Sequence, residues 1–220
     1  MIVINTKIRD FLEESRYVIL LIAYFLVLWV PIIFQSLHIS DELSDISLVV
    51  LMFAILNFIR KAKFYNKITL VITFFIITGR SASVGTESDS VNIANWVAML
   101  IYFSVFLTIL LKQVWSAKSV NMNTILGAIA GYIQIGVIEF ILFKICDALF
   151  DGKAFNTTVS IADIIYFSFV TLTTVGYGDI TPVVDEARAF SVIFAMIGQF
   201  YMAILMALLV GKYQQEHSKQ

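Results

Sequence analysis

The sequence predicts an all-α integral membrane protein, and its composition and its apolar runs lead to this class. Of the 220 residues, 60% are hydrophobic and only 14% are charged, whereas a soluble domain is nearer half apolar and a quarter charged. The mean hydropathy is +0.89. Several apolar runs are long enough to cross the hydrocarbon core of a bilayer, which takes about 20 helical residues. The net charge of -1 gives no basic surface that would indicate nucleic-acid binding.

The apolar runs predict six membrane crossings. Four runs have the length of a full span, and each of two shorter runs could be a span with polar ends or an interfacial segment. Pro31 falls inside the first run and predicts a kink there. The long runs are residues 17–37, 90–111, 122 to about 147, and 189–210, and the short runs are residues 46–59 and 68–79.

A different pattern follows the fifth predicted span. The segment SIADIIYFSFVTLTT has about a dozen helical residues before a turn-rich stretch, which is too short to cross the bilayer. Ser160 followed by Asp163 resembles a capping box and predicts a helix start. We expect a short re-entrant helix that dips into the bilayer and returns as an irregular loop. Irregular backbone at that depth must be buried in protein or line a water-filled cavity.

Basic residues predict the orientation of the crossings, because cytoplasmic segments carry an excess of Lys and Arg. With six crossings and a cytoplasmic N-terminus, eleven basic residues lie inside and three outside, with Lys144 near the outer end of the fifth span. We therefore expect both termini in the cytoplasm and the re-entrant loop on the outer face. The inside residues are Lys7, Arg9, Arg16, Arg60, Lys61, Lys63, Lys67, Lys112, Lys118, Lys212 and Lys219, and the outside residues are Arg80, Lys153 and Arg188.

The loop after the short helix reads TTVGYGD over residues 173–179. This stretch resembles, letter for letter, the selectivity filter of potassium channels of the six-transmembrane, voltage-gated-like superfamily. The layout of residues 122–211 also resembles the pore module of that family, while the first 112 residues resemble it in layout only. The resemblance implies potassium as the permeant ion, bound by residues of the filter. These are Thr174, Val175, Gly176, Tyr177 and Gly178.

The filter letters have a physical reason. An ion that loses its hydration shell in a narrow pore needs replacement oxygens, and rings of backbone carbonyls supply them. For successive carbonyls to face one axis, the backbone must alternate between left- and right-handed regions, which glycine does without steric cost. Gly176 and Gly178 meet this need. One loop per chain cannot close a ring, so we expect a homotetramer around a central pore.

Residues beside the filter are expected to support it. Tyr166 and Phe167 stand where the family often has two tryptophans, and Thr173 begins the filter. Tyr166 is a candidate hydrogen-bond donor to Asp179, with simple packing as the alternative. Four copies of Asp179 at the outer mouth would concentrate cations there.

The sixth span carries the predicted inner-cavity face. Gly198 matches the family's inner-helix hinge glycine, although glycines also serve close helix packing in membranes. Five further residues share one face by their 3/4 spacing, and a helix–helix seam is the alternative to a cavity lining. They are Gln199, Met202, Met206, Ala207 and Val210.

Glu139 is an ionisable residue in the middle of the fifth span. Intramembrane ionisable residues are functional candidates by default. Glu139 is therefore a candidate proton sensor. The alternative is a structural contact, in which it pairs with Lys144 or a neighbouring helix.

The first four spans lack the arginines of a voltage sensor. The fourth reads NWVAMLIYFSVFLTILL, with no positive charge before Lys112. Steep voltage gating needs several charges moving across the field, so we expect weak or no voltage dependence. The predicted parts are an amphipathic cytoplasmic N-terminus (1–16), a four-helix sensor-like domain (17–112), a pore domain (113–211) and a short cytoplasmic tail (212–220).

The resulting functional hypothesis is a potassium-selective channel in the plasma (inner) membrane of a prokaryote, without strong voltage gating. We expect no cofactor, no metal beyond potassium, no ligand-binding domain in this chain and no enzymatic activity. A non-conducting sensor or regulatory subunit on a channel scaffold is the alternative. A potassium transporter is a third hypothesis, but such transporters have several pore loops in one chain, and this chain has one.

Overall fold

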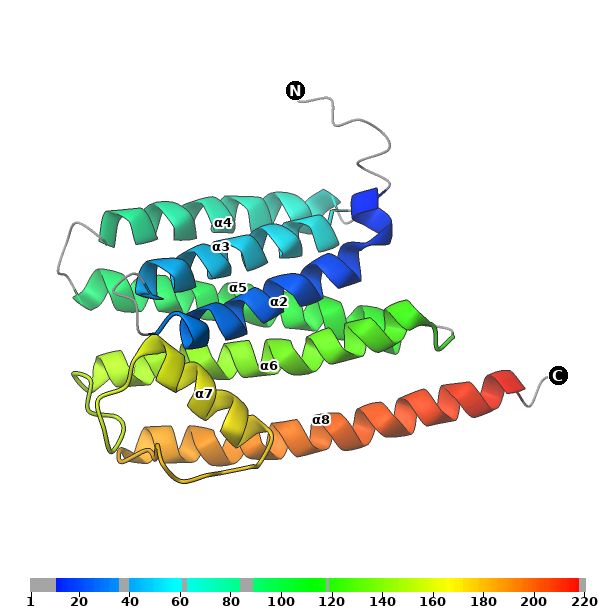
Figure 1. Ribbon diagram of the computed structural model, residues 1–220. Coiled ribbons are helices and arrows are strands. Elements are labelled where there is room, and N and C mark those ends of the chain that lie inside the picture. Colours follow the sequence, from blue (N-terminus) through cyan, green and yellow to red (C-terminus); the bar gives the residue numbers. More distant parts are fainter. Residues whose placement is uncertain (1–10, 36–39, 61–62, 84–88, 118, 218–220) are drawn as a thin grey trace. The chain divides into compact units, whose positions relative to one another are not determined.

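A computed structural model describes residues 11–35, 40–60, 63–83, 89–117 and 119–217. Within these residues every regular element is a helix, apart from one isolated antiparallel bridge between Phe155 and Pro182 (Figure 1). The prediction of an all-α chain is therefore confirmed. The chain divides into two compact units, Met1–Thr78 and Gly79–Gln220, each described by itself below.

The first unit holds α2 (Arg16–Ile33), α3 (Ser40–Phe58) and most of α4 (Lys63–Ser83). α2 and α3 form an antiparallel pair. At one end of the pair Tyr17 meets Phe58 edge to face, with ring centroids 5.0 Å apart. The guanidinium of Arg16 lies over both rings, a cation–π arrangement suited to an interface between apolar and aqueous surroundings. Pro31 lies inside α2, as the sequence placed it.

The second unit holds α5 (Asp89–Trp115), α6 (Met122–Leu149), α7 (Ile161–Leu172) and α8 (Asp185–His217). α5 and α6 pack antiparallel along their length. Trp96 meets Phe140 edge to face at 5.9 Å. Farther along, Gln134 Nε2 donates to the Phe103 carbonyl at 3.1 Å. This bond satisfies a buried amide between two apolar helices, where an unpaired polar group would be costly.

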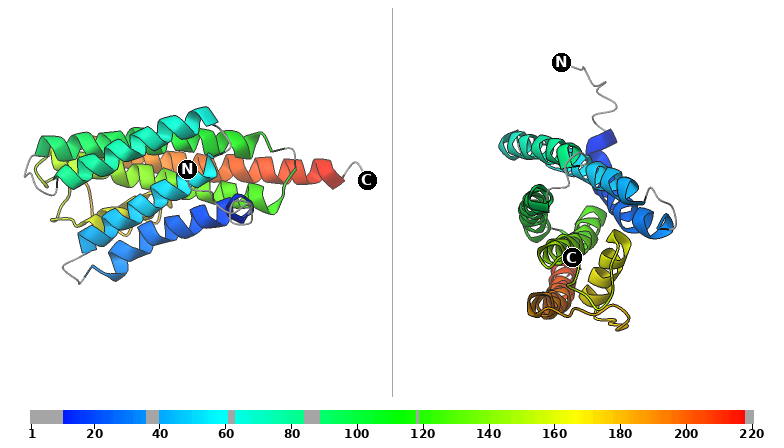
Figure 2. Two further views of the ribbon diagram at one scale, coloured as in Figure 1. Left: turned by 90° about the horizontal axis from the view of Figure 1, so that it is seen from above. Right: turned by 90° about the vertical axis from the view of Figure 1, so that its left-hand side faces the viewer.

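α6 is the central helix of the second unit, because α5, α7 and α8 all pack against it. Figure 1 and the right-hand view of Figure 2 show the short α7 beside both α6 and α8. α8 runs antiparallel to α6, and Tyr201 Oη donates to the Ala128 carbonyl at 2.6 Å. A buried cluster of Ile135, Leu172 and Phe194 joins α6, the end of α7 and α8.

Four helices of the described chain are long and apolar enough to cross a membrane: Arg16–Ile33, Asn92–Trp115, Met122–Leu149 and Asp185–Lys212. Leu43–Phe58 and Asn66–Gly79 are shorter apolar helices. The predicted count of six crossings therefore stays a prediction. Of the predicted N-terminal segment 1–16, residues 1–10 lie outside the described residues, as do residues 218–220 of the predicted tail.

Candidate functional site

α7 begins with the capping box that the sequence predicted. The Ser160 hydroxyl oxygen accepts from the Asp163 backbone N–H, while the Asp163 carboxylate accepts from the Ser160 N–H at 2.8 Å. These reciprocal bonds satisfy two backbone donors that a helix start otherwise leaves unpaired. The helix ends at Leu172, twelve residues after it begins. The short helix before the TTVGYGD loop is therefore confirmed.

The loop after α7 has an alternating backbone. Thr174, Gly176 and Gly178 have positive φ angles of 59°, 58° and 81°. The left-handed backbone expected at the two glycines is therefore present. Thr174 shares this conformation, which the sequence did not predict because L-residues other than Gly pay a steric penalty there. Strain of this kind at a non-glycine residue is typical of functional sites.

The alternation leaves the carbonyl groups of the loop without partners. In the described part of the chain, the carbonyl oxygens of Thr174, Val175, Gly176 and Tyr177 accept no hydrogen bond. The amides at the start of the loop point back to α7, since the N–H groups of Val175 and Gly176 both donate to the Val170 carbonyl. Backbone carbonyls are strong acceptors that rarely stay unpaired away from water. The loop thus offers a row of free oxygens.

Tyr166 holds the outer end of the loop. Its hydroxyl donates to Asp179 Oδ2 at 2.8 Å, as the sequence suggested. This hydrogen bond lowers the pKa of the Asp179 carboxyl below its usual value and raises the pKa of Tyr166. The Tyr166 ring also stacks parallel to the Tyr177 ring, with centroids 6.4 Å apart. Tyr166 therefore joins α7 to both Tyr177 and Asp179 of the TTVGYGD loop.

Asn156 is a second support that the sequence reasoning missed. Its side-chain Nδ2 donates to the Asp179 carbonyl at 3.2 Å, and its Oδ1 accepts from the Thr181 N–H at 2.9 Å. The Asn156 backbone N–H donates to the Thr181 carbonyl. These contacts clamp the segment after the filter to the segment before α7. No local pattern signals the clamp, because it joins residues 23 to 25 positions apart.

Phe167 faces away from the filter loop. Its ring meets Phe143 of α6 at 5.0 Å and Phe155 at 5.1 Å, and it is 6% exposed. It therefore fixes α7 onto α6, while its neighbour Tyr166 fixes the loop. Thr173 sits at the end of α7, where its hydroxyl donates to the Phe169 carbonyl at 2.6 Å.

Two consecutive residues of α8 meet the lower end of the loop. Gln199 Nε2 donates to the Thr174 hydroxyl at 3.1 Å. Gly198 lies so close to the Leu172 carbonyl oxygen that a Cβ atom would collide with it. Close approach to α7 is thus one demonstrated need for glycine at this position, and the hinge role stays a prediction.

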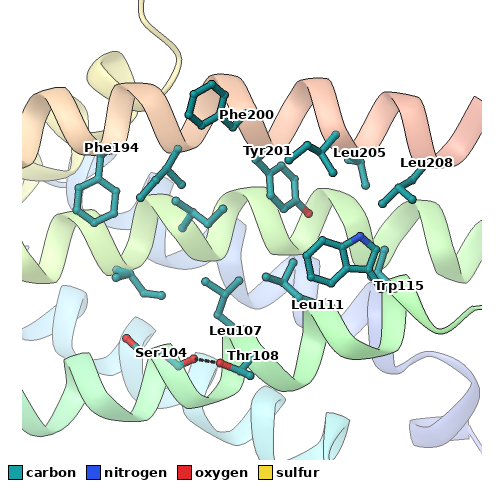
Figure 3. Close-up of a pocket in the computed structure, with 15 residues that line it drawn as sticks. Ser104, Leu107, Thr108, Leu111, Trp115, Phe194, Phe200, Tyr201, Leu205 and Leu208 are labelled. Carbon is teal, nitrogen blue, oxygen red and sulfur yellow. Dashed lines mark hydrogen bonds between the residues drawn. The ribbon is translucent and has the colours of Figure 1, made fainter.

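α8 has two different faces. One face lines an apolar groove of about 540 Å³ together with α5 and α6. Figure 3 shows Phe194, Tyr201, Leu205 and Leu208 of α8 beside the α5 residues Leu107 and Leu111. None of the five predicted cavity residues lines this groove. Those residues lie on the other face, where all are exposed within one chain, namely Gln199, Met202, Met206, Ala207 and Val210.

Glu139 is completely buried in α6, with 0% exposure. Both of its carboxyl oxygens lack a hydrogen-bond partner in the described part of the chain. The alternative that Glu139 pairs with Lys144 or with a neighbouring helix has no support among the described residues of this single chain. The two residues are five positions apart, so their side chains leave the helix about 140° apart.

Comparison with protein families finds a match in the C-terminal part of the chain. Residues 128–215 match the family of ion channels. The matched segment contains most of α6, all of α7, the TTVGYGD loop and nearly all of α8. Because the match is to ion channels, the prediction that the chain is not an enzyme is confirmed.

Individual potassium channels also match parts of this chain. The chain is 32% identical over 89 residues to two-pore potassium channel 2 of Arabidopsis thaliana, covering 40% of this chain and 19% of the relative. It is 32% identical over 116 residues to the voltage-gated potassium channel Kch of Escherichia coli, covering 52% and 26%. Two pore potassium channel c of Oryza sativa is 47% identical over 54 residues, covering 24% and 12%. The matches thus span about a quarter or less of these relatives, and no solved structure matches the chain.

Proposed function

We propose that the protein is a potassium-selective channel that conducts K⁺ passively across a membrane. The observation that carries this proposal is the row of unpaired carbonyls at Thr174, Val175, Gly176 and Tyr177 on an alternating backbone. Four such rows around one axis would replace the hydration shell of an ion. The Thr174 hydroxyl and the Gly178 backbone complete the filter. Similarity of the pore domain to potassium channels supports the choice of ion.

The channel is a homotetramer, because a ring of carbonyls needs several copies of the loop. The exposed surfaces of one chain support this assembly. In α8, only 11% of the most apolar stretch is buried within one chain, which is the lowest share among the four candidate spans. The filter side chains Val175 and Tyr177 are 54% and 72% exposed. Neighbouring copies would cover these apolar surfaces, which a single chain leaves open.

Each predicted residue has a role in this assembly. Asp179 forms a ring of negative charge at the outer mouth and concentrates cations. Below the filter, the exposed face of α8 lines the inner cavity, with Gln199 as its polar residue beside Thr174. Tyr166 and Thr173 support the filter from α7, and Phe167 acts indirectly by holding α7 against α6. Gly198 is the hinge at which α8 bends.

The first four helices do not sense voltage strongly. In α5 the last turn carries Lys112 as its basic residue, and the sequence of this helix has no basic residue before it. Without charges that move across the bilayer, the membrane potential has little to act on. We propose that all six runs cross, that both termini are cytoplasmic and that the protein resides in the inner membrane of a prokaryote.

The alternative function is a non-conducting sensor or regulatory subunit on a channel scaffold. The strain at Thr174 argues against this alternative. A positive φ at a non-glycine residue costs about 1–2 kcal/mol, and a subunit that does not conduct has no use for the carbonyl row that this strain creates.

The test is reconstitution into liposomes with an outward K⁺ gradient. The proposal predicts barium-sensitive K⁺ flux and much slower Na⁺ flux. Gly178→Ala should abolish selective flux, because Gly178 has a φ of 81° that alanine adopts only with strain. Gly211→Ala is the matched control, since its Cβ meets nothing within 4 Å and its φ is not positive. Equal K⁺ and Na⁺ flux in the wild type would reject potassium selectivity.

The tetramer is tested separately from conduction. Native mass spectrometry of the protein in detergent should give a mass four times that of one 24.8 kDa chain, plus bound lipid. A monomeric or dimeric protein that still carries selective flux in liposomes would contradict the single-loop geometry of the proposed pore.

A further inference from the structure

Glu139 occupies a position that no part of the conduction pathway explains. It lies in α6, a candidate membrane span, with 0% exposure and two unpaired carboxyl oxygens within the described residues. Burying an ionised, unpaired carboxylate costs several kcal/mol, whereas the neutral acid costs far less. With α6, α7 and α8 packed as the structure has them, Glu139 is therefore neutral.

The register of α6 places Glu139 between α7 and α8. Phe143 and Ile135 each lie about 40° around the helix from Glu139, on opposite sides of it. Phe143 contacts Phe167 of α7. Ile135 packs against Phe194 of α8 in the cluster that also contains the last residue of α7. The carboxyl group thus sits behind the helix that carries the filter, where α7 and α8 converge on α6.

Tyr132 connects this position to the start of the filter. It lies on the same side of α6 as Glu139, seven residues or about two helical turns earlier. Its hydroxyl donates to the Leu172 carbonyl at 3.3 Å. Gly198 of α8 abuts the same carbonyl. A shift of α8 away from α7 would therefore open the space around Glu139 and the end of α7 together.

We propose that Glu139 is a protonation site that couples the position of α8 to pH. The neutral acid stabilises the arrangement in which α8 packs against α7 and the pore is closed. When α8 moves away and water reaches the carboxyl group, Glu139 releases its proton, and the carboxylate stabilises the open arrangement. Rising pH therefore favours opening. This regulation rests on the proposed channel function, because it acts on the helix that lines the pore.

Other ionisable groups on the surrounding helices do not replace Glu139 in this role. Within the described residues none of them forms a hydrogen bond or ion pair with it. Most have other partners or lie at helix ends. On α7, Asp163 is bonded to Ser160 and Tyr166 to Asp179. On α8, Tyr201 bonds the Ala128 carbonyl and Lys212 the carbonyls at the end of α5 and beyond it. The remaining groups are Tyr102 and Lys112 of α5, Tyr132, Lys144, Cys146 and Asp147 of α6, and Asp185, Glu186 and Arg188 of α8.

The first test measures K⁺ flux in proteoliposomes between about pH 5 and about pH 9. Wild-type flux should rise by at least about fivefold, the lower end of typical coupling between two sites. Glu139→Gln mimics the neutral acid, so its flux should stay at the low-pH level throughout. Glu139→Asp keeps a titratable carboxyl and should retain a pH dependence with a shifted midpoint. Lys144→Gln is the control on the same helix and should behave as wild type.

The second test reads the position of α8 without conduction. Hydrogen exchange of residues 190–201 in the detergent-solubilised protein is compared between wild type and Glu139→Gln at each pH, which cancels the intrinsic effect of pH on exchange. Exchange should be faster in the wild type at high pH and equal at low pH. If wild type and Glu139→Gln have the same dependence of K⁺ flux on pH and the same hydrogen exchange, Glu139 does not have the proposed role, while the channel function still holds. Absence of any K⁺ flux with a pH-dependent exchange difference would overturn the channel function and retain the protonation site.

Discussion

Gly198 of α8 lies directly against the carbonyl oxygen of Leu172, the last residue of α7. This contact brings α8 against the residue that directly precedes the TTVGYGD loop. It also explains why no side chain is accommodated at position 198. The next residue, Gln199, then reaches the Thr174 hydroxyl. α8 therefore contacts the start of the TTVGYGD loop in two ways. Gly198 allows a close approach to the Leu172 carbonyl, and Gln199 donates a hydrogen bond to Thr174.

We expect Gly198→Ala to destabilise the pore domain. The added Cβ would collide with backbone rather than with a movable side chain, so α8 or α7 must shift. Overpacking of this kind typically costs about 1–3 kcal/mol. A lower thermal midpoint in detergent and reduced K⁺ flux should follow. Gly211→Ala, which meets no neighbouring atom, should leave both unchanged. A Gly198→Ala protein with wild-type stability would show that α7 and α8 accommodate a methyl group at position 198 without cost.

Removal of the Tyr166 hydroxyl should change the acid sensitivity of the outer mouth. The hydrogen bond from Tyr166 lowers the pKa of Asp179, so its stabilisation is present above the usual aspartate pKa and is lost as pH falls through the lowered value. In Tyr166→Phe this pKa should return toward its usual value. Flux should then fall at a higher external pH than in the wild type. Identical flux curves against external pH would contradict this account.

The Asn156 clamp should be measurable by comparing two substitutions. Asn156→Ala removes both side-chain hydrogen bonds to the segment after the filter. Each bond contributes about 0.5–1.5 kcal/mol, so limited proteolysis between residues 179 and 184 should become faster. Asn156→Asp keeps the acceptor for the Thr181 N–H and should have an intermediate effect. Equal proteolysis of all three proteins would show that the clamp does not hold this loop.

Loss of the Gln199 amide should impair conduction more than stability. Gln199→Ala removes the donor to Thr174 Oγ1 and leaves the strained Thr174 less restrained. One hydrogen bond of about 0.5–1.5 kcal/mol corresponds to a two- to tenfold decrease in K⁺ flux. Met206→Leu, on the same exposed face of α8, is the control. A similar decrease in the control would assign the effect to the cavity surface rather than to this bond.

Local residue patterns were sufficient to predict several features of the site. Ser160 and Asp163 predicted the start of α7, because a capping box involves only neighbouring residues. Gly176 and Gly178 predicted a left-handed backbone, because only glycine adopts it freely. The positive φ of Thr174 could not be predicted, since it is imposed by bonds from the loop to α7 and α8 against the residue's own preference.

Contacts between distant segments were decided by the tertiary structure. Tyr166 and Phe167 are adjacent and similar, yet one holds the filter and the other packs against α6, because neighbouring helical residues point about 100° apart. Glu139 was visible as an intramembrane carboxyl, but the sequence left open whether it is a proton sensor or makes a structural contact. Burial and the missing partners became apparent only once α7 and α8 enclosed α6.

The sequence by itself determined the helical membrane class, the short helix and the left-handed backbone at Gly176 and Gly178, because hydrophobicity, capping and glycine conformations are properties of neighbouring residues. The tertiary structure decided that Tyr166 and Asn156 bond to the loop and the segment after it. It also decided that the Glu139 carboxyl is buried without a hydrogen-bond partner among the described residues. The contacts of Asn156 and Gly198, and the burial of Glu139, depend on groups that lie far away in the chain. Hydrogen bonds and steric contacts of this kind depend on distances in space, which the order of residues alone does not specify.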